Sequence, residues 1–123
     1  MTLKIVAAGI GSREIHQILA QYDSTLVEAQ VMSDFEGAQA VQRGDVDFYF
    51  GACYSGQGGA LAAAIAILGY SNTAMVGTPG RAADPKKVSE AVAQGIKAFG
   101  MTHDQIAQAV PLIVDALLAK AST

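Results

Sequence analysis

One stretch, residues 46–61, decides the fold: Val46-Asp47-Phe48-Tyr49-Phe50-Gly51-Ala52-Cys53-Tyr54-Ser55-Gly56-Gln57-Gly58-Gly59-Ala60-Leu61. Its first half is an apolar run typical of a strand that is covered on both faces. Its second half is a glycine-rich turn that leads into an apolar helical segment. Free backbone N–H groups converge where such a turn meets a helix N-terminus, and they favour anions. The stretch therefore predicts an anion-binding loop that follows a buried strand.

Outward from this stretch, strands alternate with helices along the whole chain. Strands are predicted at 3–8, 25–32, 46–52 and 73–77, with helices at 13–22, 34–41, 60–68 and 85–99 and a last helix that begins after Thr102. Pro111 should kink or divide that last helix. The alternation favours an α/β fold, a three-layer sandwich with a four-stranded parallel sheet of flavodoxin-like or Rossmann-like type. In the flavodoxin-like order 2-1-3-4, ligands bind between the first and third strands, at their carboxyl ends.

Capping residues support these boundaries. Ser12 is the expected N-cap of the first helix, and Ser33 with Glu36 fits a capping box at the start of the second. Gly44 stands where a helix is expected to end. Asp84 precedes a proline at the first position of the fourth helix, which is a common arrangement.

Composition limits the class of protein. The 123 residues, 51% hydrophobic and 15% charged, predict one globular domain over 1–123. A net charge of −3 and a pI near 5.1 argue against nucleic acid or an anionic membrane as partners. The longest apolar run, 60–68, is shorter than the ~18 residues of a membrane span. The single cysteine fits a reducing compartment, so we expect a soluble cytoplasmic protein.

Nucleotide motifs are incomplete in this chain. The segment Gly56-Gln57-Gly58-Gly59-Ala60-Leu61 has Leu61 in place of the third glycine of a dinucleotide fingerprint, and Gly9-Ile10-Gly11 is followed by Glu14 at that position. The chain has no Gly-Lys-Ser or Gly-Lys-Thr, and its His, Cys, Asp and Glu residues show no metal-ligand spacing. We therefore predict no cofactor and no metal, and a small phosphorylated or carboxylated molecule as the ligand.

The order Cys53-Tyr54-Ser55-Gly56-Gln57-Gly58 resembles the Cys-Gly-Thr-Gly-x-Gly loop of the B-type ribose phosphate isomerases. That loop also follows a buried strand and precedes an alanine-rich helix. Here tyrosine replaces a glycine and serine replaces the threonine, and the resemblance extends over 45–76. It implies that Cys53 is the base that moves a proton between neighbouring sugar carbons and that Ser55 assists ring opening.

A second resemblance extends over nearly the whole chain. Gly51-Ala52-Cys53, the small-residue loop, the helix that ends at Gly69-Tyr70, and Ala98-Phe99-Gly100 are similar to the YhfU-like family of bacterial proteins. The function of that family is unknown. The resemblance therefore implies a relationship and no activity.

The candidate site residues follow from the loop and from the strand ends. A cysteine at a helix N-terminus or near a cation has a lowered pKa and can abstract a proton beside a carbonyl. A buried structural cysteine is the alternative. Arginines that follow strand ends can bind a phosphate with two hydrogen bonds. The predicted catalytic residues are Cys53 and Ser55, and the predicted ligand-binding residues are Gly11, Ser12, Arg13, Tyr54, Gly56, Gln57, Gly58, Gly59 and Arg81.

Three functions fit this pattern. The first is a site for a sugar phosphate or small acid, with isomerase-like proton transfer through Cys53. The second is a non-catalytic ligand-binding or regulatory subunit that uses the same loop. The third, a phosphotransferase component of the IIB type, fits less well because those proteins carry their cysteine after the first strand, where this chain has Gly9-Ile10-Gly11. The apolar helix at 60–68 predicts a homo-oligomer, a dimer or larger.

Overall fold

The computed structural model describes residues 2–54 and 59–122, and it contains one five-stranded sheet. All the strand pairs are parallel, in the order β2-β1-β3-β5-β4. The sheet confirms the predicted α/β sandwich, although with five strands instead of four. The predicted site residues Ser55, Gly56, Gln57 and Gly58 lie outside the described residues.

The strands alternate with helices along the chain. The strands are β1 (Leu3–Gly9), β2 (Val27–Met32), β3 (Phe48–Cys53), β4 (Thr73–Gly77) and β5 (Ala98–Thr102). The α-helices are α1 (Ser12–Leu19), α2 (Asp34–Arg43), α3 (Ala62–Leu68), α4 (Pro85–Ala93) and α5 (Ile106–Ala121). Short 3-10 turns occupy η1 (Gly59–Leu61), η2 (Tyr70–Asn72) and η3 (His103–Gln105).

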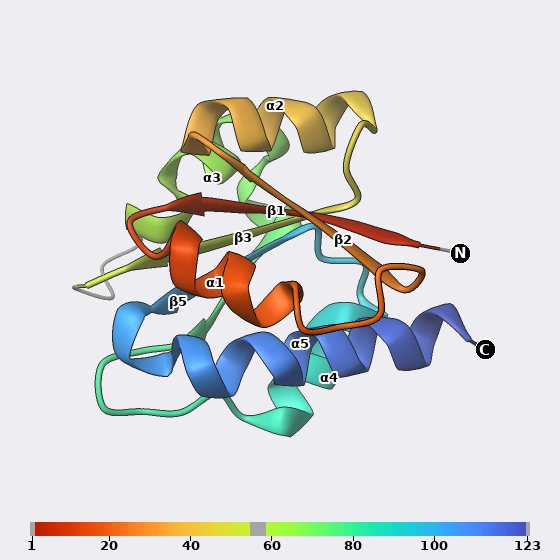
Figure 1. The fold of residues 1–123 in the computed structure, drawn as a ribbon. Coiled ribbons are helices and arrows are strands. Elements are labelled where there is room, and N and C mark those ends of the chain that lie inside the picture. The colour runs from red at the N-terminus through yellow and green to blue at the C-terminus, as the bar shows by residue number, and fades with distance from the viewer. Residues whose placement is uncertain (1, 55–58, 123) are drawn as a thin grey trace.

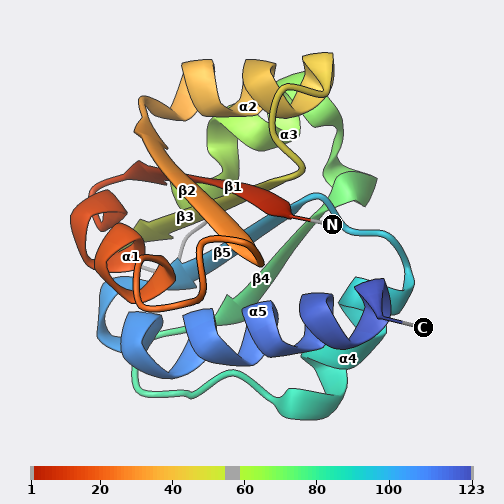
Figure 2. The same cartoon turned by 45° about the vertical axis from the view of Figure 1, so that its right-hand side comes forward.

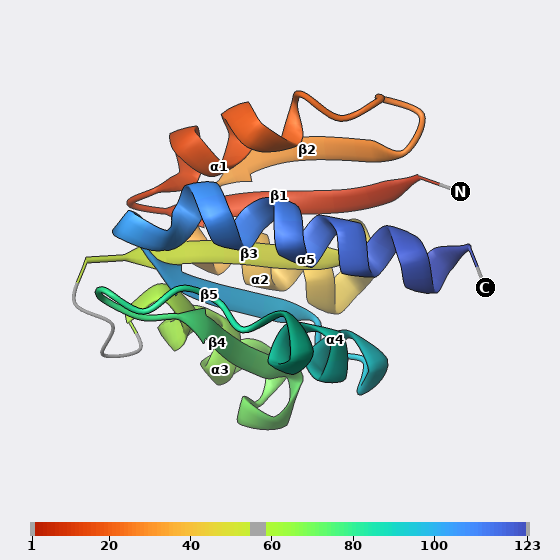
Figure 3. The same cartoon turned by 90° about the horizontal axis from the view of Figure 1, so that it is seen from below.

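The helices form a layer on each face of the sheet. Figure 1 shows α2 and α3 above the sheet and α1, α4 and α5 below it, and the turned view in Figure 2 agrees. Seen from below, the strands follow the order β2, β1, β3, β5, β4 across the molecule (Figure 3). Both ends of the described chain lie beside the amino ends of the strands, opposite the loops that follow β1 and β3 (Figure 1).

The fifth strand corrects the predicted helix over 85–99. The helix α4 ends at Ala93, and Gly95 turns the chain with a φ of +83°, a conformation that favours glycine. The segment Ala98–Thr102 is then fully buried as β5 between β3 and β4. A run covered by strands and helices on all sides needs no amphipathic pattern. Its apolar sequence is therefore compatible with both a helix and a central strand.

Burial explains which strands lie at the edges. Every residue of β5 is buried, whereas β4 is only half-buried over its first four residues and β2 carries the exposed side chain of Val31. The chain therefore passes from β3 over the position of β5 to the edge strand β4, and then returns through α4. The first three strands follow the order 2-1-3 of the flavodoxin-like alternative, and the fifth strand lies between the third and the fourth.

Helix ends follow the predicted caps except at two places. The Ser33 hydroxyl accepts from the Glu36 amide and donates to its carboxylate, which is the predicted capping box. Ser12 is the first helical residue and not the cap, because Gly11 occupies the N-cap position of α1. Thr102 is the last residue of β5, and α5 begins at Ile106 and continues through Pro111 as one helix. Of the two predicted effects of Pro111, division of the helix is therefore wrong, and a kink stays a prediction.

Alternating side chains of the sheet supply two cores. Phe50 and Phe99, both fully buried, meet edge to face with ring centroids 5.8 Å apart on the side of α1, α4 and α5. On the other side Tyr49 packs with Val6 and Leu61 beneath α2 and α3. The alternation sets which face each later residue of β3 points to, and so fixes the direction of Cys53.

Candidate functional site at the carboxyl edge

The loops after β1 and β3 meet at the carboxyl edge of the sheet, where the strands end. β1 pairs with β3, and the chain leaves these two strands toward opposite sides of the sheet, β1 toward β2 and β3 toward β4. Parallel sheets bind ligands at such a point. A cavity of about 200 Å³ lies there. Its walls are Gly9, Ile10, Asp34, Tyr49, Ala52, Cys53, Gly59 and Ala60.

Cys53 is the last residue of β3 and forms part of the cavity wall. Because it is four residues after Tyr49, it faces the α2 and α3 side of the sheet. Only 7% of the residue is exposed. A Cβ atom on Gly59 would lie 3.8 Å from the Cys53 Cβ, which is ordinary contact. Cys53 is therefore a largely buried residue of the cavity wall.

The turn η1 is held against β3 by a close approach that only glycine allows. A Cβ atom on Gly51 would lie 2.5 Å from the Ala60 carbonyl oxygen and 2.9 Å from the Tyr49 ring. The Tyr49 hydroxyl donates to the same Ala60 oxygen at 3.1 Å. Burial, and then the nearby Asp34 carboxylate, raises the pKa of Tyr49, so the phenol stays protonated as a donor. These contacts hold Ala60, which lines the cavity, against β3.

A second group of side chains lies on the opposite face of the sheet, next to the same edge. The Tyr54 ring stacks on His103 with centroids 5.0 Å apart, and Nε2 of His103 lies 3.6 Å from Oε1 of Glu14. Tyr54 is 65% exposed. The pKa of Glu14 is lowered first by a hydrogen bond from the Glu14 backbone amide to its own carboxylate, and then by His103. The other Glu14 oxygen is buried and accepts no hydrogen bond from the described residues.

The predicted residues of the first loop have mixed roles. Gly11 is buried, and a Cβ there would lie 2.6 Å from the Ile106 Cδ1 and 2.9 Å from the Ala52 Cβ. Close packing therefore explains why a residue without a side chain stands at this position. Ser12 is half-buried and Arg13 is exposed in the first turn of α1. No side chain caps this helix at its N-cap position, so its first amides face the carboxyl edge without that partner.

Arg81 lies apart from the Cys53 cavity. It closes the turn after β4 through two backbone hydrogen bonds with Thr78 and lines a separate cavity of about 220 Å³ with Asp84 and Lys87. Because β5 lies between β3 and β4, Arg81 follows a strand two positions away from the cysteine strand. The structure therefore brings together Cys53 and Gly59 but places Arg81 in different surroundings.

Three polar residues at this edge were not selected as site residues from the sequence. Two are Glu14 and His103, described above. The third is Asp104, whose carboxylate accepts from the Thr102 hydroxyl at 2.5 Å and from the Gly80 amide at 2.9 Å. The Gly80 amide, and then the Thr102 hydroxyl, lower the pKa of Asp104. The missing signal was β5, because its recognition would have placed residues 102–104 at the carboxyl edge.

Among residues 2–54 and 59–122, no cluster of His, Cys, Asp and Glu has the composition to hold a metal ion. No helix in that part of the chain is long and apolar enough to cross a membrane.

The fold and the edge cavity define a class: a small α/β sandwich with a parallel sheet and a cavity at its β1/β3 switch point. Within that class the chain belongs to the family described as "Protein of unknown function DUF2620", whose model matches residues 3–117. The chain is 32% identical over 114 residues to the uncharacterized protein YhfU of Escherichia coli (strain K12), covering 93% of this chain and 97% of that protein.

The YhfU protein of Shigella flexneri is similar to the same extent, with 32% identity over 93% of this chain and 97% of its own length. The predicted YhfU-like relationship is therefore correct. No solved structure matches the chain. The names of these relatives state no activity, so the function has to be argued from the site.

Proposed function

We propose that this protein binds a small anionic molecule, a sugar phosphate or a small hydroxy acid, at the carboxyl edge between the loops after β1 and β3. The observation that carries the proposal is the cavity of about 200 Å³ that Gly9, Cys53 and Gly59 line together. At roughly 30 Å³ for each water, this volume suits a ligand of a few carbon atoms or one end of a larger one.

The polar groups around the cavity suit a molecule that carries both hydroxyl groups and an acidic group. The Asp34 carboxylate is an acceptor for ligand hydroxyls. Arg13 and the N-terminus of α1 stand outside the lining, at the loop after β1, where a guanidinium and a helix N-terminus favour negative charge. An acidic group is therefore expected toward α1 and the hydroxyl groups toward Asp34.

If the site is catalytic, Cys53 is the group that moves a proton. Its thiolate would take a proton from a carbon beside the ligand carbonyl, forming the S–H bond while the C–H electrons pass to the carbonyl oxygen as an enediolate. Return of that proton to the neighbouring carbon, the former carbonyl carbon, together with transfer of the adjacent hydroxyl proton to the former carbonyl oxygen, completes an isomerisation and regenerates the thiolate. A binding or regulatory subunit uses the same cavity without this step, and its Cys53→Ser variant keeps every measured property.

Thermal stability in the presence of candidate ligands tests the binding. Inorganic phosphate, ribose 5-phosphate and glycerate are added to the native protein, and a ligand that binds the folded state must raise the melting temperature. The Gly59→Ala variant adds a methyl group beside Cys53 at an ordinary contact distance of 3.8 Å. It should fold normally and lose the ligand-induced shift because its cavity is narrowed.

The matched control is Ala66→Ser, which adds one heavy atom at an exposed position of α3 outside the cavity. It should keep the full ligand-induced shift. Equal shifts for Gly59→Ala, Ala66→Ser and the unchanged protein would place the ligand elsewhere and contradict the proposal. No shift with any of the three compounds would contradict the proposed ligand class.

A further inference from the structure

A charge-free segment of the sequence forms one side of the molecule. Between Asp47 and Arg81 the chain has no Asp, Glu, Lys, Arg or His, so its 8 basic and 11 acidic residues all lie outside 48–80. This segment contributes β3 to the centre of the sheet and β4 to an edge. Figure 3 shows α3 next to β4, on the side of the molecule opposite to α1 and β2. Depletion of charged residues is typical of the core of a protein–protein interface.

The surface of α3 and η2 has small and aromatic residues. Ala62 and Ala66 are exposed, and because they are four residues apart they lie on one face of α3. Tyr70, the first residue of η2, is 77% exposed, the largest value for a large hydrophobic side chain in 2–54 and 59–122. Tyrosine is enriched in interfaces because its ring is apolar and its hydroxyl group forms hydrogen bonds. We call these three residues and the outer edge of β4 the β4 face.

The outer edge of β4 offers backbone groups to a further strand. Its one partner strand among the described residues is β5, so the other edge of β4 lies open. The strand Thr73–Gly77 holds no charged residue and no proline, two kinds of residue that protect exposed edges. A bulge interrupts the register with β5 after Met75, so 73–75 is the regular part of the edge. Unpaired N–H and C=O groups along this part are complementary to another strand.

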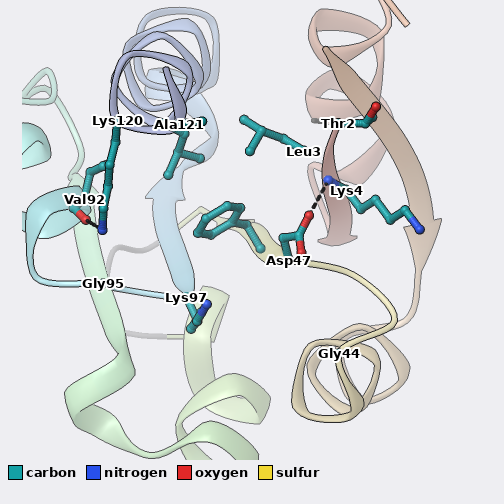
Figure 4. Close-up of a pocket in the computed structure, with 12 residues that line it drawn as sticks. Thr2, Leu3, Lys4, Gly44, Asp47, Val92, Gly95, Lys97, Lys120 and Ala121 are labelled. Atoms are coloured by element: carbon teal, nitrogen blue, oxygen red, sulfur yellow. Dashed lines mark hydrogen bonds between the residues drawn. The ribbon is translucent and has the colours of Figure 1, made fainter. Parts of the chain in front are cut away.

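The charged residue next to the amino end of β4 points away from the β4 face. The Lys97 amide donates to the Asn72 carbonyl at 3.0 Å, just before β4. The Lys97 ammonium, however, lies 5.5 Å from the centroid of the Phe48 ring in the central strand β3. Figure 4 shows this side chain at a cavity of about 630 Å³ at the amino edge of the sheet, which Asp47 also lines. The charge of Lys97 is therefore directed toward β3 and not toward the outer edge of β4.

Further charges border the carboxyl half of β4, on the face of the sheet that α4 covers. Arg81, Asp84 and Lys87 line a cavity of about 220 Å³ together with two residues of β4. The helix α3 lies on the opposite face of the sheet. An interface centred on 73–75 and α3 would thus have these three charged side chains at its rim, and interface rims are ordinarily polar.

The other edge strand, β2, has a different charge pattern. It carries Glu28, and Asp34 and Glu36 follow it in the first turn of α2. A twofold axis brings residues near the axis close to their own copies, so a pair of chains joined at β2 would place acidic groups near acidic groups. The uncharged edge of β4 carries no such repulsion. Of the two edges, β4 is therefore the one that is complementary to itself.

We propose that the β4 face binds a second copy of this chain across a twofold axis, with the two β4 strands paired antiparallel. An axis normal to the sheet keeps both α3 helices on one face of the joined sheets. It also places Arg81, beyond the carboxyl end of one β4, next to the amino end of the other, so the two arginines stay apart. No residue of the β4 face lines the Cys53 cavity, so the inference is independent of the ligand proposed there.

The exposed residues of α3 and η2 have to take part in this contact. The strand β4 has five residues, whereas stable interfaces bury roughly 1,200–2,000 Å² in total, with about 20–30 residues from each partner. Because strand pairing alone is too small, Ala62, Ala66 and Tyr70 are expected to become buried in the dimer. Their side chains carry no charge that would lose its water without a partner.

Sedimentation equilibrium of the native protein over a range of micromolar concentrations tests the association. The average mass should rise from the 12.7 kDa of one chain toward twice that value as the concentration increases, because dimerisation follows mass action. A mass of 12.7 kDa at every concentration would overturn the proposal and leave a strand of a different protein as the occupant of this edge.

Three substitutions place a charge on the β4 face. Ala66→Lys, Ala66→Glu and Tyr70→Lys should each raise the dissociation constant of the dimer by about tenfold or more, because each dimer would bury two unpaired charges. Both signs at Ala66 should act alike, whereas an effect of the net charge of −3 would make lysine strengthen the dimer and glutamate weaken it. The matched control is Ala119→Lys at an exposed position of α5, on the other face of the sheet, and it should dimerise like the unchanged protein.

The same loss for Ala119→Lys as for Ala66→Lys, or unchanged dimerisation of all three β4-face variants, would contradict the proposal. A circular dichroism melt of each variant shows whether its fold is intact. A second readout is amide hydrogen exchange: protection of the β4 amides should fall on dilution and in Ala66→Lys, while protection of the β2 amides stays the same. Concentration-dependent protection confined to β2 would also overturn the proposed edge.

Discussion

Replacement of Gly51 by alanine tests how the cavity wall is built. The new Cβ atom would lie 2.5 Å from the Ala60 carbonyl oxygen, so the turn η1 must withdraw by about 1 Å to restore a van der Waals separation of roughly 3.5 Å. That withdrawal also stretches the 3.1 Å hydrogen bond from the Tyr49 hydroxyl to the same oxygen. Gly51 and its neighbours thus link the stability of the fold to the geometry beside Cys53.

The expected loss of unfolding free energy follows from three contributions. Overpacking in a close-packed interior costs about 1–3 kcal/mol, and the weakened hydrogen bond costs about 1 kcal/mol. The smaller conformational freedom of the unfolded chain returns about 0.4–1 kcal/mol. The net expectation for Gly51→Ala is a loss of about 2–3 kcal/mol, which lowers the melting temperature of a domain of this size by about 10 °C.

Urea and thermal denaturation followed by circular dichroism measure this loss. The control Gly44→Ala stands where nothing lies within 4 Å but where φ is +84°, so it should lose only about 1 kcal/mol through backbone strain. Tyr49→Phe should also lose about 1 kcal/mol, through the hydrogen bond alone. If Gly51→Ala were as stable as the unchanged protein, the close packing of η1 on β3 would be refuted.

Three further predictions concern Phe99 in the core, Asp104 after the end of β5 and Tyr22 after the end of α1. Phe99→Ala, at a fully buried position of β5, should lower the free energy of unfolding in urea by about 4 kcal/mol. The hydrogen bonds that lower the pKa of Asp104 contribute stability that is present above the usual pKa of the carboxyl group and is lost as pH falls through its lower folded value. Asp104→Asn should therefore lower the melting temperature at pH 7, and its difference from the unchanged protein should shrink in acid; a constant difference would contradict the assignment. Burial, and then Asp115, raises the pKa of Tyr22 to about 12, so Tyr22→Phe should remove the phenolate absorbance that appears near that pH and leave the rest of the alkaline titration unchanged.

Local signals in the sequence were sufficient for elements such as α2 and β4. The capping box at Ser33 and the left-handed glycine at Gly44 define α2 in the structure as they do in the sequence, and the strand predicted at 73–77 is β4. These signals depend on hydrogen bonds and backbone conformations within a few residues of each other. They can be identified from the sequence without knowledge of the tertiary structure.

The part of the fold that follows α4 depends on tertiary contacts that local patterns do not contain. Ala98–Thr102 was predicted as a helix end and a cap, because an apolar run that is buried on all sides lacks the alternation of an ordinary strand. Pro111 remains inside α5, where the buried neighbours Val110, Ile113 and Val114 pack on the sheet. Burial of these side chains outweighs the cost of a proline within the helix.

The candidate site was predictable only where it follows the cysteine strand. The loop after β3 could be selected because its glycines and cysteine are contiguous in the sequence. Glu14 and His103 could not, since the pairing of Cys53 with Thr102 across β3 and β5 is what brings His103 beneath Tyr54. The distance of Arg81 from the cavity likewise depends on the unpredicted strand between them.

The most direct test of the carboxyl-edge site is the rate at which Cys53 reacts with iodoacetamide in the native protein. The chain has one cysteine, so the mass of the intact protein reports that residue alone. Because Cys53 is buried and lines the cavity, we predict slow alkylation that ribose 5-phosphate or phosphate slows further, and faster alkylation in Gly51→Ala, where η1 is displaced. An alkylation rate that no anion in the panel changes would contradict a ligand site at this edge.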